Sequence, residues 1–177
     1  MNSSKLSLLF TLSLIFISFA PLPILGINLY ETVCKDAGKD NARCLNLLKQ
    51  YPEITSAKNY VELCRSILEM AIKKSTEGQN YLKGMMNKNP SPAIKECATV
   101  DYDELVGSFK SSLGELVEDP STANYDAKVA GDGPDTCDRA LAQAKIVDPS
   151  ISTQNNDMKF LSIVAFLATN HLPQRHS

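Results

Sequence analysis

The sequence predicts an all-α protein: an up-down-up-down four-helix bundle preceded by a small N-terminal helical hairpin and held by two disulfides. Apolar residues recur at spacings of three and four along four segments, each of about 17–30 residues, as in helices that bury one face. Proline, glycine and asparagine separate these segments, so we expect short loops between antiparallel neighbours. No segment shows the alternation of a surface strand, and 177 residues are a length typical of one domain.

Residues 1–26 read as a secretory signal peptide cleaved after Gly26. Lys5 supplies the positive start, and a mostly apolar run of about 15 residues follows, shorter than the ~20 that span a bilayer. We therefore expect a secreted protein with no membrane partner after cleavage. Its helical domain covers residues 27–172, and a frayed tail covers residues 173–177.

Two short helices, residues 28–37 and 42–51, are predicted to open the mature chain, with Pro52 ending the second. Cys34 lies on the first helix and Cys44 on the second, across a turn. An antiparallel pair of helices would bring these two cysteines together. The pair is too small to fold alone, so we expect a bridge to hold it.

The first bundle helix is predicted over residues 57–86, with Ser56 as its N-cap. Cys64 falls on the apolar stripe of this helix, between Tyr60 and Leu68. A cysteine facing the core is most simply a buried free thiol that packs as a small apolar residue. A reactive or intermolecular thiol is the alternative.

The next two bundle helices form a hairpin that runs from Cys97 to Cys137. The outgoing helix is expected over residues 92–118, and Ser121 is expected to cap the returning one. At ~1.5 Å per residue the outgoing leg from Cys97 is ~33 Å and the returning leg ~24 Å. Extended backbone over residues 131–134 would add roughly 7 Å to the return and level the two sulfurs. We therefore expect a Cys97–Cys137 bridge.

The last helix is predicted from Ser152, as its N-cap, to about residue 170. Residues 160–168 are apolar almost all round, which is typical of a helix buried on several sides. This run is far too short to span a membrane.

The five cysteines allow several pairings. Leaving one thiol free and pairing the other four gives fifteen arrangements, and counting alone selects none of them. A secreted route makes bridges the default.

Charge and composition exclude several classes of partner. The net charge is −2, and loss of Lys5 leaves 17 basic residues against 20 acidic ones, or −3. This balance argues against nucleic acid as a partner. The chain has no tryptophan and few other aromatic residues, which argues against a carbohydrate-stacking groove.

The sequence has no enzymatic constellation. The histidines, His171 and His176, fall in the last seven residues, so the predicted body offers no histidine to activate a cysteine or serine. Asp101, Asp103 and Glu104 lie early in a helix, where acids are ordinary partners of the helix dipole. We expect no catalytic residue.

We expect no cofactor and no metal either. No paired-cysteine, HExxH or calcium-loop spacing occurs in the sequence. The glycines at 131 and 133 follow a helix rather than a strand, which indicates a kink and not a phosphate loop. Binding remains as the function, either by a protein-inhibitor bundle or by a lipid carrier. Two bridges and long helices favour the filled core of the inhibitor.

The order of these features resembles the plant invertase/pectin methylesterase inhibitor family over residues 27–172. A signal peptide precedes a two-cysteine hairpin, a long helix, a second long segment that starts near Cys97, the run YDAKVAGDGPDTC that ends at Cys137, and a final apolar helix. The resemblance implies disulfides Cys34–Cys44 and Cys97–Cys137, with Cys64 free. It also implies a plant apoplast or cell-wall setting, or the vacuole.

The family divides by target. In its pectin methylesterase inhibitors, faces of the second to fourth bundle helices cover the enzyme's cleft, and the residue before the last bridging cysteine lies in the contact. That residue is Thr136 here, beside Asp135. Invertase inhibitors present Pro-Lys-Phe at the turn between the second and third bundle helices. The corresponding turn here has Asp119, Pro120, Ser121 and Thr122, so the lysine and the phenylalanine are missing.

The resemblance therefore implies a secreted inhibitor of a plant cell-wall enzyme, which binds it one to one. Pectin methylesterase is the expected target and acid invertase the alternative. A non-inhibitory secreted bundle is a third possibility. The Asp132 to Asp135 segment departs from the family, in which this helix is continuous, and it could reshape the contact face.

Overall fold

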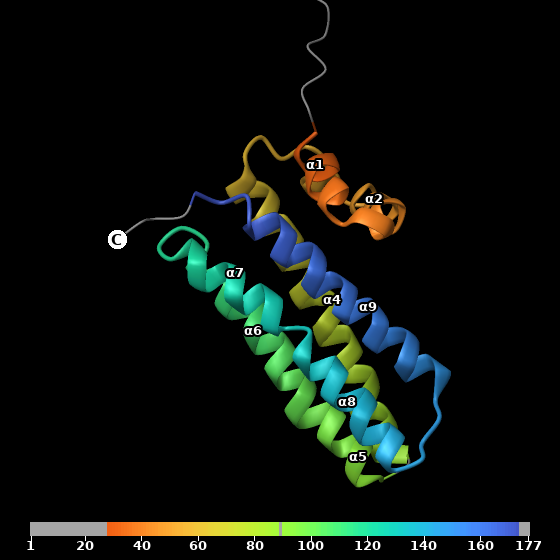
Figure 1. Cartoon of the computed structure of the whole chain (residues 1–177). Helices are drawn as coiled ribbons and strands as arrows, with labels where there is room; N and C mark the ends of the chain where they lie inside the picture. Colours follow the sequence, from red (N-terminus) through yellow and green to blue (C-terminus); the bar gives the residue numbers. More distant parts are fainter. Residues whose placement is uncertain (1–27, 89, 174–177) are drawn as a thin grey trace, which may run out of the picture.

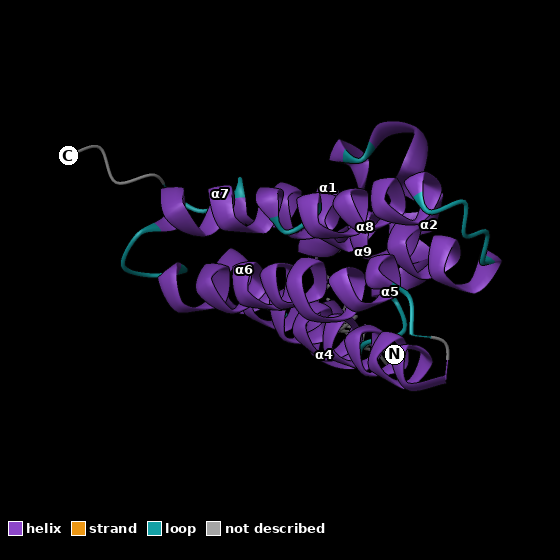
Figure 2. Ribbon diagram, turned by 90° about the horizontal axis from the view of Figure 1, so that it is seen from below, coloured by secondary structure: helices purple, strands orange, loops and turns teal. Residues whose placement is uncertain are grey.

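A computed structural model describes residues 28–88 and 90–173, and every regular element in these ranges is helical (Figures 1 and 2). The predicted signal peptide at 1–26 and most of the predicted tail lie outside the described residues. The helices are α1 (Leu29–Asp36), α2 (Asn41–Leu48), α3 (Pro52–Thr55), α4 (Tyr60–Lys88), α5 (Pro92–Glu96), α6 (Tyr102–Glu115), α7 (Pro120–Val129), α8 (Asp132–Gln143) and α9 (Pro149–Thr169), with a 3₁₀ turn η1 (Gly38–Asp40) and a π-helical segment η2 (Cys97–Asp101).

The bundle has the predicted up-down-up-down order. In Figure 1, α4 runs along the molecule, α5 and α6 return beside it, α7 and α8 run back, and α9 closes the bundle. Helix α4 packs against α6 and α9, and α7 packs against the same two helices, so the four legs enclose one core. No helix in the described ranges is long and apolar enough to cross a membrane.

The N-terminal hairpin consists of α1 and α2, joined by η1 and by a disulfide between Cys34 and Cys44 with their Cα atoms 5.4 Å apart. Gly38 has φ +57 in the turn, a conformation that favours glycine. Helix α1 packs against α9 and α4, and Arg43 of α2 adds a further contact between this N-terminal hairpin and the bundle. Its guanidinium donates to Asp157 on α9 over 2.7 Å and lies 4.0 Å from the ring centre of Phe160.

The core is filled by the side chains that the helical spacing predicts. Cys64 is fully buried and unpaired, and burial raises its pKa to about 12. Buried residues of α9 point to the other helices and to the hairpin, as its apolar run predicts: they are Ile151, Met158, Phe160, Leu161, Val164, Ala165 and Ala168.

The serines predicted as N-caps, Ser56, Ser121 and Ser152, do not begin helices. Helix α7 begins after Asp119, whose carboxylate accepts the backbone N–H of Thr122 over 3.0 Å. Helix α9 begins in the same way after Asp148, whose carboxylate accepts the N–H groups of Ser150 and Ile151. In both cases proline occupies the first helical position, where its missing N–H costs nothing.

The long helix α4 begins three residues later than predicted. Asn59 precedes it and accepts the backbone N–H of Glu62 over 2.9 Å, while Ser56 instead follows the short helix α3. Pro52 was expected to end a helix, but α2 ends at Leu48 and Pro52 begins α3. A proline is as compatible with a helix start as with a helix stop, and here the start prevails.

The hairpin from Cys97 to Cys137 differs from the prediction on both legs. The outgoing leg is not one helix: η2 interrupts it, and α6 ends at Glu115 rather than at residue 118. The prediction of extended backbone over residues 131–134 is also wrong. The break between α7 and α8 lies at Ala130 and Gly131, and α8 begins at Asp132. Pro134 then falls in the first turn of α8, where no intrahelical N–H is required. The shorter outgoing helix, not an extended return, levels the cysteines.

Candidate functional site

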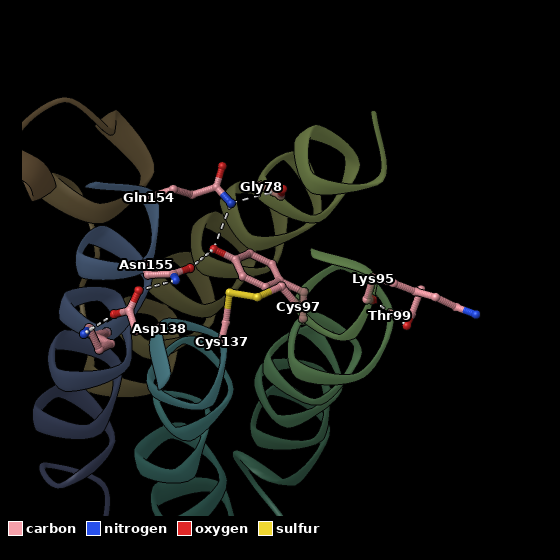
Figure 3. Close-up of a disulfide and its surroundings, with 10 residues drawn as sticks. Gly78, Lys95, Cys97, Thr99, Cys137, Asp138, Gln154 and Asn155 are labelled. Carbon is pink, nitrogen blue, oxygen red and sulfur yellow. Dashed lines mark hydrogen bonds and ion pairs between the residues drawn. A yellow bond between two sulfur atoms is a disulfide. The ribbon is translucent and has the colours of Figure 1, made fainter. Parts of the chain in front are cut away.

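The disulfide between Cys97 and Cys137 joins the start of the outgoing leg to α8, with the Cα atoms 4.8 Å apart. Both cysteines are fully buried. Figure 3 shows the bridge between the helices, next to a chain of polar side chains. The Cys97–Cys137 hairpin is therefore closed by a covalent bond at this end of the bundle.

The π-helical segment lies directly against the first turn of α8. A Cβ atom at Gly133 would collide with the backbone carbonyl oxygen of Asp101, the last residue of η2. Only glycine allows this approach of two backbones. The π segment and the start of α8 therefore form one closely packed unit, fastened one turn further on by Cys137.

The two predicted contact residues of α8 are held by their neighbours. Thr136 is half-buried, and its hydroxyl oxygen accepts a hydrogen bond from Arg139 over 2.7 Å. Asp135 is exposed, and its carboxylate pairs with Lys159 of α9 over 3.0 Å. A partner that binds this surface would meet side chains that are already positioned, which lowers the entropic cost of binding.

Lys159 also pairs with Asp138 over 2.9 Å. Partial burial opposes the charge of Lys159, but the hydrogen bonds that its ammonium donates to Asp138 and Asp135 outweigh burial, so the pKa of the lysine is raised. One ammonium group thus pairs with two carboxylates at adjacent turns of α8. This fastens α8 to α9 beside the surface that carries Thr136.

A polar chain continues from Asp138 into the core (Figure 3). Asn155 donates to Asp138 over 2.6 Å, and its oxygen accepts the hydroxyl of Tyr102 over 2.8 Å. Gln154 donates both to the oxygen of Tyr102 and to the backbone carbonyl of Gly78 on α4. Tyr102 is fully buried, and burial raises its pKa above its ordinary value. The chain fixes the register of α4, α6, α8 and α9 at the end of the bundle that has the disulfide.

Asp101 is not the ordinary early-helix acid that the sequence predicts. Its side chain is 2% exposed, and its Oδ2 atom has no hydrogen-bond partner in the described structure. Burial, then the charges of Glu96 and Glu104, raise its pKa to about 6, although Arg139 acts in the opposite direction. The carboxylate lies within 4.8 Å of the sulfurs of Cys97 and Cys137, but a disulfide provides no thiolate to hold a metal.

Residues 119–122 form the N-terminal cap of helix α7. The carboxylate of Asp119 accepts both the N–H and the hydroxyl of Thr122, and Pro120 is buried. The hydrogen bonds from Thr122, chiefly that of the backbone N–H, lower the pKa of Asp119. Ser121 is exposed, but its side chain is short. The turn therefore presents no long charged or aromatic side chain.

The six predicted contact residues do not form one site. From Pro120 to Thr136 the chain advances sixteen residues, or ~24 Å along a helical path. In Figure 1 the turn between α6 and α7 lies at one end of the bundle, and α8 extends toward the other. The surface around Thr136 and Asp135 and the turn at Asp119 are separate candidates.

Several residues of this site were not predicted from the sequence. Arg139 and Lys159 carry no motif, and their roles depend on which helices become neighbours. The one sequence signal was the spacing of Asp135, Asp138 and Arg139 on one face of a helix, which is common on solvated helices.

A separate groove of about 500 Å³ lies outside the bundle core, between α2, α4 and α9. Leu47, Met158 and Leu161 contribute apolar surface, and Arg43 and Lys74 contribute charge. It is a surface groove at the junction of hairpin and bundle, not the internal cavity that a lipid carrier of this class would need.

Comparison with known proteins gives consistent results. A family model described as plant invertase/pectin methylesterase inhibitor matches residues 28–172. Pectinesterase inhibitor 2 of Arabidopsis thaliana is 23% identical over 148 residues, which cover 79% of this chain and 82% of that protein.

Two crystal structures have the same fold. A mutant form of a pectin methylesterase inhibitor from Arabidopsis superposes with a TM-score of 0.71 at 22% identity, over 82% of this chain and 98% of that one. A pectin methylesterase inhibitor from Arabidopsis thaliana gives a TM-score of 0.61 at 22% identity, over 85% of this chain and 100% of that one.

Proposed function

The chain belongs to the plant invertase/pectin methylesterase inhibitor family, and we propose that its target is a pectin methylesterase. The bundle binds the enzyme one to one and occludes its cleft with the exposed side of α8, which carries Asp135 and Thr136. The protein acts after secretion, in the apoplast and cell wall, or in the vacuole.

The observation that carries this proposal is the way α8 presents Thr136. The disulfide at Cys137, the hydrogen bond from Arg139 and the pairing of Asp135 with Lys159 all immobilise this turn. A surface held in this way loses little side-chain freedom on binding. The relative named Pectinesterase inhibitor 2 supports the same target class.

The turn at Asp119 gives acid invertase less support. An inhibitor that inserts a loop into an active site needs side chains that fill it, and charged or aromatic anchors commonly carry most of the binding energy. Here Asp119 and Thr122 are engaged with each other, and the side chain of Ser121 is short. Acid invertase therefore remains the alternative target, and a bundle that inhibits neither enzyme is the third possibility.

A pair of matched variants tests the contact surface. Thr136→Lys places a long charged side chain at the centre of the proposed contact. Asn80→Lys makes a similar change at an exposed residue of α4, a helix that carries none of the predicted contact residues. Both proteins are checked for an unchanged melting temperature, and inhibition constants against a plant pectin methylesterase are then measured.

We expect Thr136→Lys to weaken inhibition at least tenfold, corresponding to about 1.4 kcal/mol or more. Asn80→Lys should inhibit like the unmodified protein. If both variants inhibit equally well, α8 is not the contact surface. If the unmodified protein inhibits acid invertase and leaves the esterase fully active, the target class is wrong.

A further inference from the structure

A buried carboxyl group lies directly beneath the surface formed by Asp135 and Thr136. Asp101 is 2% exposed, and its Oδ2 atom has no partner in the described structure. Its backbone carbonyl touches Gly133, just before the two contact residues, and its carboxylate lies near the sulfur of Cys137, just after them. Asp101 therefore lies next to the buried side of the proposed contact turn at both of its ends.

The surroundings of this carboxyl favour its neutral form. Glu96 of α5 and Glu104 of α6 face it with negative charge, and Arg139 of α8 is the positive group that acts on it. From α4 the uncharged Gln79 reaches the π segment and donates to the carbonyl of Ala98. A charge placed on Asp101 would have no hydrogen-bond donor from the described residues at its buried Oδ2 atom to stabilise it.

Arg139 links the carboxyl to the surface. Its guanidinium donates to the hydroxyl of Thr136, and it is also the cation that acts on Asp101. When Asp101 is neutral, the guanidinium is free to hold Thr136. When Asp101 ionises, its negative charge competes for the same guanidinium, and solvation of the new charge favours opening of the first turn of α8.

We propose that Asp101 is a positioning residue that holds the first turn of α8, with Asp135 and Thr136, in a closed form while it is protonated and loosens that turn when it ionises. A role of this pH-dependent loosening in enzyme recognition rests on the proposed function. The loosening itself is a property of the free protein.

The sign of the pH dependence follows from the two states of the turn. In the closed form the pKa of Asp101 is about 6, and in an open, hydrated form it returns to its ordinary value of 3.8. The closed form is therefore fully favoured below about pH 4 and loses this advantage as the pH rises through 6. A difference of about two pKa units corresponds to a change of up to ~100-fold in the opening equilibrium.

Hydrogen exchange of the full mature chain measures this opening without any enzyme. Amide protection over residues 132–137 is compared with protection in α4 from pH 4 to pH 7, after correction for the intrinsic exchange rate. We expect protection in α8 to fall by up to ~100-fold relative to α4. Asp101→Asn, which keeps the shape and cannot ionise, should abolish that fall.

Two neighbouring variants separate this role from a merely structural one. Glu96→Gln should move the midpoint to lower pH, because it removes a like charge. Arg139→Gln should move the midpoint to higher pH, because it removes a cation that lowers the pKa of Asp101. Glu118→Gln, on the far end of the same hairpin, should leave the midpoint unchanged.

The result is decisive in either direction. Protection that is flat with pH in the unmodified protein, or an equal fall in Asp101→Asn, would overturn the proposal. If Asp101→Asn fails to fold, an NMR titration of the Asp101 carboxyl carbon replaces it: a midpoint near 6 supports the proposal, and one near 3.8 overturns it. Failure to inhibit an esterase would reject the proposed function and leave this result standing.

Discussion

Gly133 packs its backbone against the carbonyl oxygen of Asp101, and no side chain fits between them. This contact joins the π segment of the outgoing leg to the first turn of the returning helix α8. Asp135 and Thr136 follow Gly133 by two and three residues in α8. The contact at Gly133 therefore sets the position of the proposed contact turn.

Gly133→Ala should destabilise the protein. The added methyl group has to displace the backbone of Asp101 or of α8, and overpacking of this kind costs about 1–3 kcal/mol. Thermal or chemical unfolding measures the loss. Gly107→Ala is the matched control, since a Cβ there meets nothing within 4 Å in the interior of α6. That variant should gain roughly 0.5–1 kcal/mol; a comparable loss in both variants would contradict the close contact at Gly133.

The two disulfides should differ in how much they stabilise the fold. Cys97 and Cys137 are 40 residues apart and Cys34 and Cys44 are 10 apart, so loop entropy gives about 4 kcal/mol for the first bridge and about 3 kcal/mol for the second. Paired cysteine-to-serine variants, compared by urea unfolding, measure these values. If loss of the Cys34–Cys44 bridge destabilised the protein more than loss of the Cys97–Cys137 bridge, the Cys34–Cys44 bridge would have a role beyond loop closure.

Cys64 should not react in the folded protein. Its side chain is fully buried, and burial raises its pKa to about 12, so almost no thiolate exists at neutral pH. Iodoacetamide at pH 8 should modify it only once denaturant unfolds the bundle, as mass spectrometry can show. Rapid modification without denaturant would mean that α4 opens locally or that the thiol is accessible.

The cap of α7 should make stability depend on acid pH. Hydrogen bonds from Thr122 lower the pKa of Asp119, so the stability that this carboxylate contributes is present above about pH 4 and is lost as the pH falls through its lowered pKa. Asp119→Ala should lower the melting temperature at pH 6 and have less effect at pH 2.

Asp119→Asn serves as the control for this cap, because asparagine caps helices without ionising. Its melting temperature should lack the part of the acid dependence that Asp119 contributes. An acid profile identical to that of the unmodified protein would assign the dependence to other carboxyl groups.

The helix order and the filled core could be predicted from the sequence because spacing of apolar residues determines both. Cys64 illustrates this: its place among Tyr60, Ile67 and Leu68 on a helical stripe is sufficient to bury it. The starts of helices were predicted less well. Pro52 was read as the end of a helix but occupies a first helical position, as Pro120 and Pro149 also do.

The candidate site was less accessible to prediction because it depends on pairs of helices. Thr136 and Asp135 were proposed from a resemblance, but the residues that hold them, Arg139 and Lys159, are ordinary surface cations in the sequence. The π segment leaves no apolar pattern that differs from an α-helix. Burial of Asp101 follows from the approach of α8 at Gly133, a contact between residues far apart in the chain.

Titration of the two candidate enzymes shows whether the protein inhibits a pectin methylesterase. A purified plant pectin methylesterase and a purified acid invertase are each mixed with increasing amounts of the protein lacking residues 1–26, and residual activity is measured from pH 4.5 to pH 7. We predict that esterase activity falls to near zero at an equimolar ratio while sucrose hydrolysis is unaffected. Full esterase activity at every ratio and pH would mean that the protein is not an inhibitor of this enzyme.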